Sequence, residues 1–306
     1  MGQVRSFQSA NRQVTPITDE SVNQPISFGT FANEVFRNFE RRWKPGTLAV
    51  NRVYLRNQIL PTFRERLVHE ITRAEVRRWF GSLHTTPAAA NRSLPILSVI
   101  MREAELEGHR PPESNPCRQI RRYPERRRER FLTTREMSRL GQLLDEREEA
   151  VPLQVGIVRL LILTGCRQSE IRTLHWADYR EGHLFLRDSK VGPRTVWLSS
   201  VGRRVLDGLP RSGSFVFASP DGSGPLSEET LYRFWHRLRS DAGLSGLRLH
   251  DLRHSYASFG LRNGETLVTI ARLLGHRDPH TTLRYIHFGE SLLREAVESV
   301  AEALED

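Results

Sequence analysis

A proline- and arginine-rich stretch at residues 111–130 divides this chain into two parts. Proline lacks a backbone N–H and disfavours helix in the residue before it. The prolines of the stretch are Pro111, Pro112, Pro116 and Pro124. They argue against a continuous helix or strand across it. Since 306 residues are also enough for two hydrophobic cores, we expect two domains joined by an arginine-rich linker at residues 117–130.

Residues 26–116 predict a small helical domain, and the arginines on its polar faces favour DNA as its partner. Apolar residues recur there every three or four positions, which is the spacing of one helix face. We expect four helices. Thr47 is expected to cap the second, which should end before Pro61, and the third should begin with a capping box of Thr72 and Glu75. Residues 1–25 are rich in Gln, Asn, Ser and Thr and predict a disordered segment.

Residues 131–306 predict a second domain of helices with one small β region. Gly165 is expected to end a very apolar helix. Alternating patterns at His183–Arg187 and Thr195–Leu198 predict a hairpin with Lys190 at or beside its tip. The remaining expectations are a strand at Ser214–Ala218, a helix over about 228–242 with Tyr232, Trp235 and Leu238 inward, and an amphipathic C-terminal helix at 291–304. The expected fold class is therefore mainly α with a small β-hairpin or sheet in the C-terminal domain.

The charge of the chain favours a polyanionic partner. Its formal net charge is +10 and its pI is about 10.4. The linker carries seven arginines against two glutamates, a density that suits a DNA backbone. We expect DNA contacts from Arg118, Arg121, Arg122, Arg126, Arg127, Arg128 and Arg130. The chain has no apolar run of 18 residues, and its two cysteines have no metal-ligand spacing, so we expect a cytoplasmic, nucleoid-associated protein without membrane contact.

Lys190 is a candidate general acid. Lys44 and Lys190 are the only lysines among the 46 basic residues. Arginine keeps its proton near neutral pH, whereas lysine can give its proton up. In a chain whose basic residues are nearly all arginine, a lysine can therefore donate a proton where arginine cannot. Neither lysine follows a glycine in phosphate-loop spacing, which argues against an ATP-driven motor.

The stretch from His250 to Tyr285 carries the densest set of candidate catalytic groups. His250 and Arg253 are three residues apart, so on a helix they share one face. A guanidinium fork and an imidazole aimed together suit a phosphate. His276 follows a glycine that breaks a helical run, and Tyr285 follows on a short polar turn of helix. We expect a site that holds a phosphodiester and attacks it with Tyr285.

Arg167 and Glu170 lie outside that stretch but belong to the same set of candidates. Arg167 follows the glycine that ends the apolar helix and lies close to the start of the next helix, where anions bind well. The structural interpretation is an arginine paired with Glu170. The functional interpretation adds Arg167 to the phosphate site.

A zinc hydrolase is a rival interpretation, because His250 and His254 have the i, i+4 spacing of zinc ligands. Position 251 is Asp rather than Glu, Arg253 would repel a cation, and no later cluster offers a third ligand. We therefore expect neither a metal nor a cofactor, and we expect His254 to pack within its helix. A DNA-binding protein without chemistry is a second rival, but it leaves the six candidate residues together without explanation.

These motifs resemble the tyrosine recombinase, or phage integrase, family. The resemblance rests on T-G-C-R-Q-S-E at 164–170, the hairpin Lys190, H-D-L-R-H-S at 250–255, L-G-H at 274–276 and T-T-L-R-Y-I-H at 281–287. Weaker patterns, A-N-R at 90–92 and N-P-C at 115–117, are similar to the core-binding domain of the family. Cys166 replaces a more usual Met, Leu or Ala, and Ile286 a smaller residue.

The resemblance implies a helical, SAM-like core-binding domain and an α+β catalytic domain that form a C-shaped clamp on DNA. It implies a site-specific recombinase that cleaves and rejoins DNA strands through a 3′-phosphotyrosyl link, without metal or ATP, to integrate or excise a mobile element. Its implied catalytic residues are Arg167, Lys190, His250, Arg253, His276 and the nucleophile Tyr285, with Glu170 supporting Arg167.

The implied partners are double-stranded DNA and other copies of the chain. Four subunits would act on two duplexes, with a monomer or dimer away from DNA, and an accessory DNA-bending or directionality factor is a further candidate partner. A type IB topoisomerase, which shares the tyrosyl chemistry, is the alternative. The core-binding resemblance and the spacing of the T-G-x-R and H-x-L-R-H motifs favour the recombinase.

Overall fold

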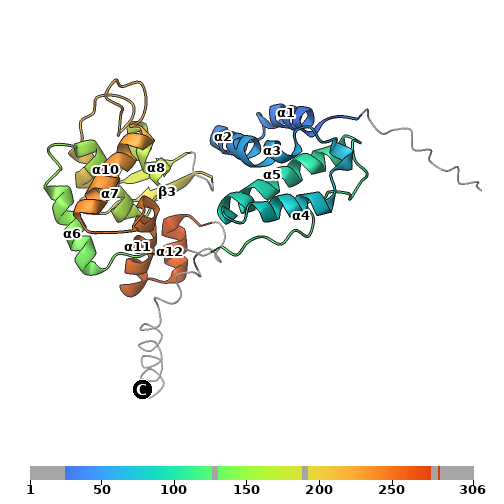
Figure 1. The fold of residues 1–306 in the computed structure, drawn as a ribbon. Coiled ribbons are helices and arrows are strands. Elements are labelled where there is room, and N and C mark those ends of the chain that lie inside the picture. The colour runs from blue at the N-terminus through green and yellow to red at the C-terminus, as the bar shows by residue number, and fades with distance from the viewer. Residues whose placement is uncertain (1–24, 126–129, 188–191, 277–281, 283–306) are drawn as a thin grey trace, which may run out of the picture. The chain divides into compact units, whose positions relative to one another are not determined.

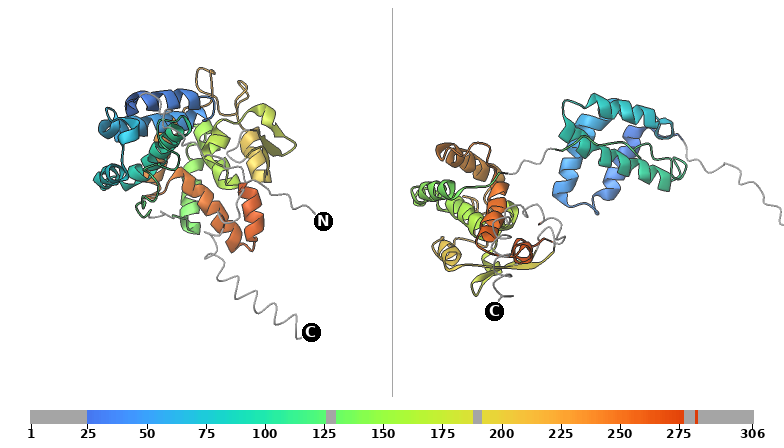
Figure 2. Two further views of the ribbon diagram at one scale, coloured as in Figure 1. Left: turned by 90° about the vertical axis from the view of Figure 1, so that its right-hand side faces the viewer. Right: turned by 90° about the horizontal axis from the view of Figure 1, so that it is seen from below.

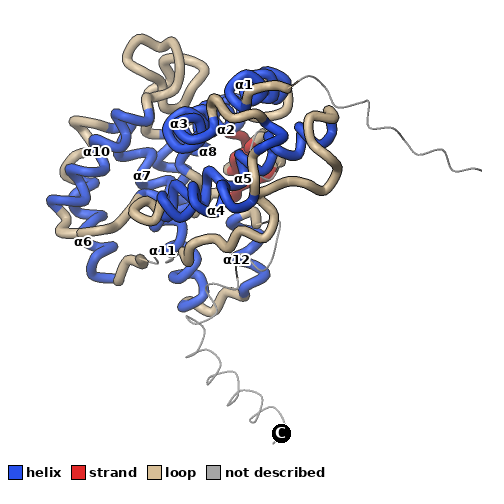
Figure 3. The backbone as a smooth tube through the Cα atoms, turned by 45° about the vertical axis from the view of Figure 1, so that its right-hand side comes forward, coloured by secondary structure: helices blue, strands red, loops and turns tan. Residues whose placement is uncertain are grey.

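The computed structural model describes residues 25–125, 130–187, 192–276 and 282 (Figure 1). Helices dominate these residues and the strands are short (Figure 3). The mainly α fold class with a small sheet is therefore confirmed. The chain forms two compact units, Met1–Arg127 and Arg128–Asp306. Nearly all of the N-terminal segment and the whole C-terminal helix that we expected lie outside the described residues.

The named elements in the described part of the first unit are all helices (Figure 2). Its elements are α1 (Phe28–Phe39), α2 (Pro45–Tyr54), the π-helical η1 (Leu55–Ile59), α3 (Leu60–Phe63), the 3₁₀ turn η2 (Val68–Glu70), α4 (Arg73–Ser82) and α5 (Pro87–Leu106). The apolar stripe of α1 buries Phe28, Phe31 and Val35 in a core shared with α4 and α5. The capping box of Thr72 and Glu75 at the start of α4 is confirmed.

The second helix differs from its prediction at both ends. It begins at Pro45, in the first turn where proline is favoured, and Thr47 is not its cap. It also does not stop before Pro61, because the chain stays helical through η1 and α3. In an α-helix the Pro61 ring would collide with the carbonyl of Asn57. The π turn, in which Leu60 N donates to the Leu55 carbonyl, widens the backbone at that point.

The first part of the linker is fixed to the helical unit. Asn91, buried in α5, donates to the Tyr123 carbonyl and accepts from the Tyr123 N–H, both at 2.9 Å. The Tyr123 ring stacks on Phe80 with 4.9 Å between ring centroids, and its hydroxyl donates to the Phe80 carbonyl. Because both backbone and ring of Tyr123 are held, the linker runs along α4 and α5 as far as this residue.

The second unit surrounds one buried helix. Its helices are α6 (Thr134–Asp145), α7 (Pro152–Thr164), α8 (Gln168–Arg172), the 3₁₀ turn η3 (Trp176–Asp178), α9 (Ser200–Asp207), α10 (Glu228–Asp241), α11 (Leu249–Arg262) and α12 (Leu267–Leu274). Helix α7 packs against α8, α9 and α11, and its apolar residues lie in the core. Gly165 ends α7 with a φ of 61°, as expected. A second cluster of apolar residues joins α11 to α12.

The small sheet places one arginine on its inner face. Strands β1 (Tyr179–Arg180), β2 (His183–Leu186) and β3 (Arg194–Trp197) are antiparallel in the order β1-β2-β3, and the tip of the predicted hairpin, with Lys190, lies outside the described residues. Leu184 pairs with Val196 and Leu186 with Arg194. Successive side chains of a strand alternate between faces. Arg194 therefore shares the inner face with the buried Leu184, Leu186 and Val196.

Two further expectations for this unit are wrong. Tyr232 is exposed, because α10 buries Leu231, Trp235 and Leu238, a stripe that begins one residue earlier than we expected. Residues 214–218 do not form a strand. They make isolated bridges, from Phe215 to His175 and from Ala218 to Pro225, so this segment contributes core side chains without joining a ladder.

Candidate active site

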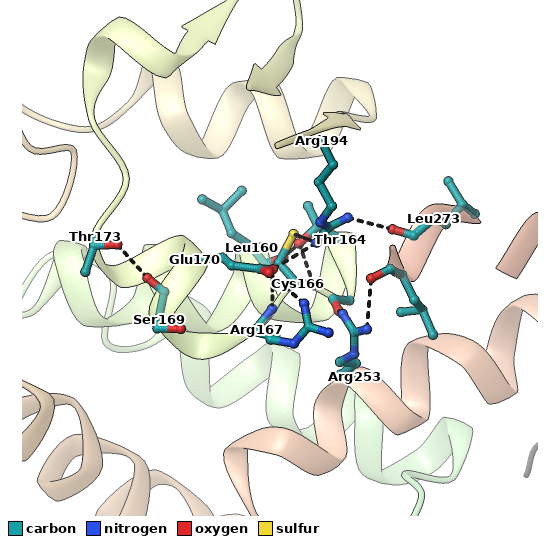
Figure 4. A network of polar contacts seen from close by, with 12 residues as sticks. Leu160, Thr164, Cys166, Arg167, Ser169, Glu170, Thr173, Arg194, Arg253 and Leu273 are labelled. Atoms are coloured by element: carbon teal, nitrogen blue, oxygen red, sulfur yellow. Dashed lines mark hydrogen bonds and ion pairs between the residues drawn. The ribbon is translucent and has the colours of Figure 1, made fainter. Parts of the chain in front are cut away.

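A cluster of three arginines around one glutamate lies where α7, α8, α11, α12 and β3 meet (Figure 4). Arg167 precedes α8, Arg194 comes from β3, and Arg253 lies in α11. Glu170 in α8 lies between Arg167 and Arg194, with N–O distances of 2.8 and 2.9 Å. Two of the three cations thus contact this largely buried carboxylate, and Arg253 lies close enough to feel its charge. This excess of positive charge suits an additional anion.

Glu170 holds two of these arginines. Its carboxylate also accepts the Arg167 backbone N–H at 2.9 Å. Burial alone would raise the pKa of Glu170, but the Arg167 N–H and the guanidinium groups of Arg194 and Arg167 lower it on balance. Glu170 therefore stays ionised, and the expected pairing of Arg167 with Glu170 is present in the structure.

Arg253 is almost completely buried and is held by backbone carbonyls. Its Nη1 donates to the Gly165 carbonyl at 2.7 Å, and its Nη2 to the Leu274 carbonyl at 2.8 Å. Burial, and then the nearby Arg167, lower the pKa of Arg253 to about 10, so it remains a cation at neutral pH. These contacts join the end of α7 to the end of α12 through one guanidinium group.

Gly165 and Gly275 stand where a side chain would collide with its neighbours. Both have a positive φ at the end of a helix, where glycine is favoured. A Cβ on Gly165 would lie 2.6 Å from Tyr256 Cδ1, and a Cβ on Gly275 would lie 2.7 Å from Arg194 Cδ. A side chain at Gly275 would therefore displace Arg194, and one at Gly165 would displace Tyr256 and Leu274.

His250 lies in the first turn of α11 beside the arginines. Asp251 fixes this turn, because its buried carboxylate accepts the backbone N–H and the guanidinium of Arg248. Burial, and then the neighbouring Arg253, lower the pKa of His250. The imidazole is therefore neutral at neutral pH and can accept a proton.

His254 has the packing position that we expected. Its ring lies edge-on to His250, with 5.1 Å between ring centroids, and also meets Phe131. In the part of the chain that the structure describes, no three or more His, Cys, Asp or Glu side chains are grouped to hold a metal ion. The zinc interpretation thus gains no support there.

His276 follows the glycine at the end of α12. Its backbone N–H donates to the Ala271 carbonyl at 2.9 Å, and its Nδ1 lies 2.7 Å from the hydroxyl oxygen of the buried Thr282. Together these contacts fix the orientation of the ring. Lys190 and Tyr285 lie outside the described residues, so the structure brings together Arg167, Glu170, His250 and Arg253, with His276 at the adjoining helix end.

Arg194 was not among the residues predicted for the site. Its guanidinium contacts Glu170, the Cys166 sulfur at 3.3 Å and the Leu273 carbonyl at 3.1 Å. The alternation of inward and outward side chains along the second hairpin strand could have pointed to Arg194. An arginine two residues before Val196 shares the buried face of that strand, and a buried arginine needs partners.

The linker arginines differ in their contacts. Arg118, Arg121 and Arg122 are exposed on the first unit. Arg130 donates to the Phe131 carbonyl and pairs with Glu136, in the capping box that begins α6. Arg126, Arg127 and Arg128 lie outside the described residues.

Comparisons with known proteins agree with the motifs. The model of the phage integrase family matches residues 130–291, and that of the phage integrase N-terminal SAM-like domain matches residues 27–84. The chain is 29% identical over 303 residues to the prophage phiRv2 integrase of Mycobacterium tuberculosis, covering 92% of this chain and 80% of that protein. It is 36% identical over 165 residues to the tyrosine recombinase XerD of Brucella suis, covering 50% and 53% of the two chains.

A solved structure has the same fold. A lambda integrase tetramer bound to a Holliday junction aligns with a TM-score of 0.70 at 22% identity, over 88% of this chain and 83% of that one. The family match spans more than half of the sequence, so this chain belongs to the phage integrase family. It is a tyrosine recombinase, of the class of enzymes that cleave and rejoin DNA strands in site-specific recombination. This match favours the recombinase over the topoisomerase alternative. None of the described helices is long and apolar enough to span a membrane.

Proposed function

We propose that Arg167 and Arg253 bind the scissile phosphate of double-stranded DNA and that Tyr285 attacks it. The observation that carries this proposal is the excess of cations. Arg167 and Arg194 pair with the carboxylate of Glu170, and Arg253 lies near them with its guanidinium on backbone carbonyls. Because the site is largely buried, a bound phosphate would interact strongly with these groups. Arg167 and Arg253 would stabilise the charge that develops on its oxygens during transfer.

Each remaining group has one task in this reaction. The Tyr285 oxygen forms a bond to phosphorus while the bond from phosphorus to the 5′-oxygen breaks, leaving a 3′-phosphotyrosyl link. His250, neutral at neutral pH, accepts the tyrosine proton. Lys190 donates a proton to the leaving 5′-oxygen, which arginine could not do. His276 donates a hydrogen bond to a phosphate oxygen. A 5′-hydroxyl from a partner strand then reverses the step and rejoins the DNA.

The first unit would bind DNA through its basic surface. Arg73, Arg77 and Arg121 line one groove of about 510 Å³, beside Tyr123. Because Tyr123 is held by α4 and α5, the backbone at Arg121 is kept beside the arginines of α4. This arrangement supports DNA contacts from the linker residues Arg118, Arg121 and Arg122, and we extend the proposal to Arg126, Arg127 and Arg128. The guanidinium of Arg130 pairs with Glu136, so Arg130 would contact a phosphate only if its guanidinium bound Glu136 and the phosphate together.

The assembly we propose is a clamp on DNA formed by the helical unit and the catalytic unit, with four copies acting on two duplexes. The likeness in fold to a lambda integrase tetramer bound to a Holliday junction supports it. Integration or excision of a mobile element is the proposed role, supported by the similarity to the phiRv2 prophage integrase. Away from DNA we propose monomers or dimers. We also propose an accessory DNA-bending or directionality factor as a partner, and association of the protein with the nucleoid.

The role of Lys190 can be tested with a changed leaving group. Lys190→Ala should cleave ordinary DNA slowly, by a factor of about 10² to 10⁴. DNA with a bridging sulfur at the scissile 5′ position has a leaving group that needs no proton, so the variant should cleave it nearly as fast as the wild type. Lys44→Ala is the matched control and should treat both substrates as the wild type does. Equal slowing of Lys190→Ala on both substrates would contradict the acid role.

A further inference from the structure

Arg194 connects three elements of the catalytic unit within one side chain. It begins β3, its Nη2 donates to Glu170 in α8 at 2.9 Å, and its Nη1 donates to the Leu273 carbonyl in the last turn of α12 at 3.1 Å. Its side chain is 10% exposed. None of the catalytic tasks above is assigned to it, yet it touches the partner of one catalytic arginine and the helix end that leads to His276.

We propose that Arg194 is a positioning residue for strand cleavage, an inference that rests on the proposed function. It acts through two contacts. The first orients Glu170, whose carboxylate holds the backbone and guanidinium of Arg167. The second fixes the end of α12, from which the chain passes through Gly275 to His276. A catalytic arginine and a catalytic histidine are thereby set by the same guanidinium group.

The end of α12 shows why a guanidinium is needed there. The last carbonyls of a helix have no partner within the helix. Two consecutive ones are taken by arginines, Leu273 by Arg194 and Leu274 by Arg253. The Arg194 stem passes directly over Gly275, leaving no room for a side chain. Because the two arginines donate to neighbouring carbonyls, a shift of Arg194 would move the same end of α12 that Arg253 binds.

The chemistry of the side chain narrows the substitutions that could replace it. Arg194 reaches a carboxylate, a carbonyl and the Cys166 sulfur from the two ends of one rigid fork. Lysine keeps the charge and the aliphatic stem, but its single ammonium cannot span acceptors on both sides. Arg194→Lys should therefore preserve the positive charge of the cluster and lose its geometry.

The test uses the full chain and a DNA duplex that the wild type converts to a covalent adduct. Single-turnover cleavage by Arg194→Lys at saturating DNA should be about 100-fold slower, as expected when reacting groups are slightly misplaced. The DNA dissociation constant should be unchanged, because Arg194 lies on the inner face of the sheet. Arg233→Lys is the matched control: Arg233 is exposed on α10 and pairs with Glu229, and its substitution should leave the rate unchanged.

Two further measurements separate positioning from general support of the fold. In a Glu170→Gln background, Arg194→Lys should slow cleavage by clearly less than 100-fold, because part of its effect passes through Glu170. Guanidinium ion at tens of millimolar should partly restore cleavage by Arg194→Ala, whereas the same concentration of sodium chloride should not.

The outcomes are distinct. A wild-type chain that forms no adduct would remove the proposed function on which the inference rests. A wild-type chain that forms the adduct, together with an Arg194→Lys variant that cleaves at the same rate, would overturn the inference alone. An Arg194→Lys variant that no longer folds, or that loses DNA affinity and cleavage equally, would also overturn it. Arg194 would then serve the fold or the binding of DNA.

Discussion

Replacing Glu170 with glutamine should destabilise the catalytic unit strongly, because this carboxylate is the counter-charge of a buried cluster. Its side chain is 3% exposed and lies 2.8 Å from Arg167 and 2.9 Å from Arg194. Glutamine has almost the same shape, so the change removes charge without opening a cavity. Removing one partner of a buried ion pair typically costs about 3 to 5 kcal/mol, and solvent screens little of that at such low exposure.

The size of the effect can be followed by calorimetry. For a unit of this size, a loss of 3 to 5 kcal/mol corresponds to a fall of roughly 6 to 20 °C in melting temperature. The transition of the helical N-terminal unit should stay where it is, because Glu170 belongs to the other compact unit. That transition is therefore an internal reference within the same sample.

Glu229→Gln is the matched control. Glu229 forms an ion pair with Arg233 at 2.7 Å, but both side chains are exposed on α10. Such a pair contributes about 0 to 1 kcal/mol. If Glu170→Gln lost no more stability than Glu229→Gln, the cluster would not depend on its counter-charge, and the reasoning from excess positive charge would be refuted.

Two other predictions concern the same site. Burial, and then Arg253, lower the pKa of His250. As the pH falls, the unfolded chain therefore takes up a proton near pH 6.5, whereas the folded chain takes it up only at lower pH. The unfolding free energy of the wild type, measured in denaturant titrations, should fall from pH 7.5 to pH 5 more steeply than that of His250→Gln, and parallel pH profiles would contradict the shift. Gly165→Ala should lower the unfolding free energy by at least about 1 to 2 kcal/mol because of its positive φ, and the clash with Tyr256 adds to this loss. Gly141→Ala, in open space on α6, should leave the unfolding free energy unchanged or raise it. Equal unfolding free energies for the two variants would contradict this account.

Much of the fold could be predicted from local chemistry. The capping boxes at Thr72 and Thr133 and the end of α7 at Gly165 depend on residues close together in the sequence, and all three are present. The errors arose where caps and turn residues do not decide the outcome. A π turn carries the helix through Pro61, and tertiary packing selects Leu231 rather than Tyr232 for burial.

The site shows the same division. The spacing of His250 and Arg253 on one helix, and the pairing of Arg167 with Glu170, follow from short-range patterns. Arg194 is brought to Glu170 from another element, 24 residues further along the chain. No local pattern reports such a contact. Only the inward face of β3 indicates that this arginine must find partners in the interior.

Tyr285 should become covalently joined to DNA without a metal ion. The most direct measurement incubates the purified chain with EDTA and DNA spanning the ends of the element that encodes it, then looks for protein–DNA adducts that resist SDS. The wild type and Tyr232→Phe, an exposed tyrosine on α10, should both form the adduct, and Tyr285→Phe should bind DNA without forming it. An adduct that persists in Tyr285→Phe, or cleavage that appears only when zinc or magnesium is added, would contradict the account.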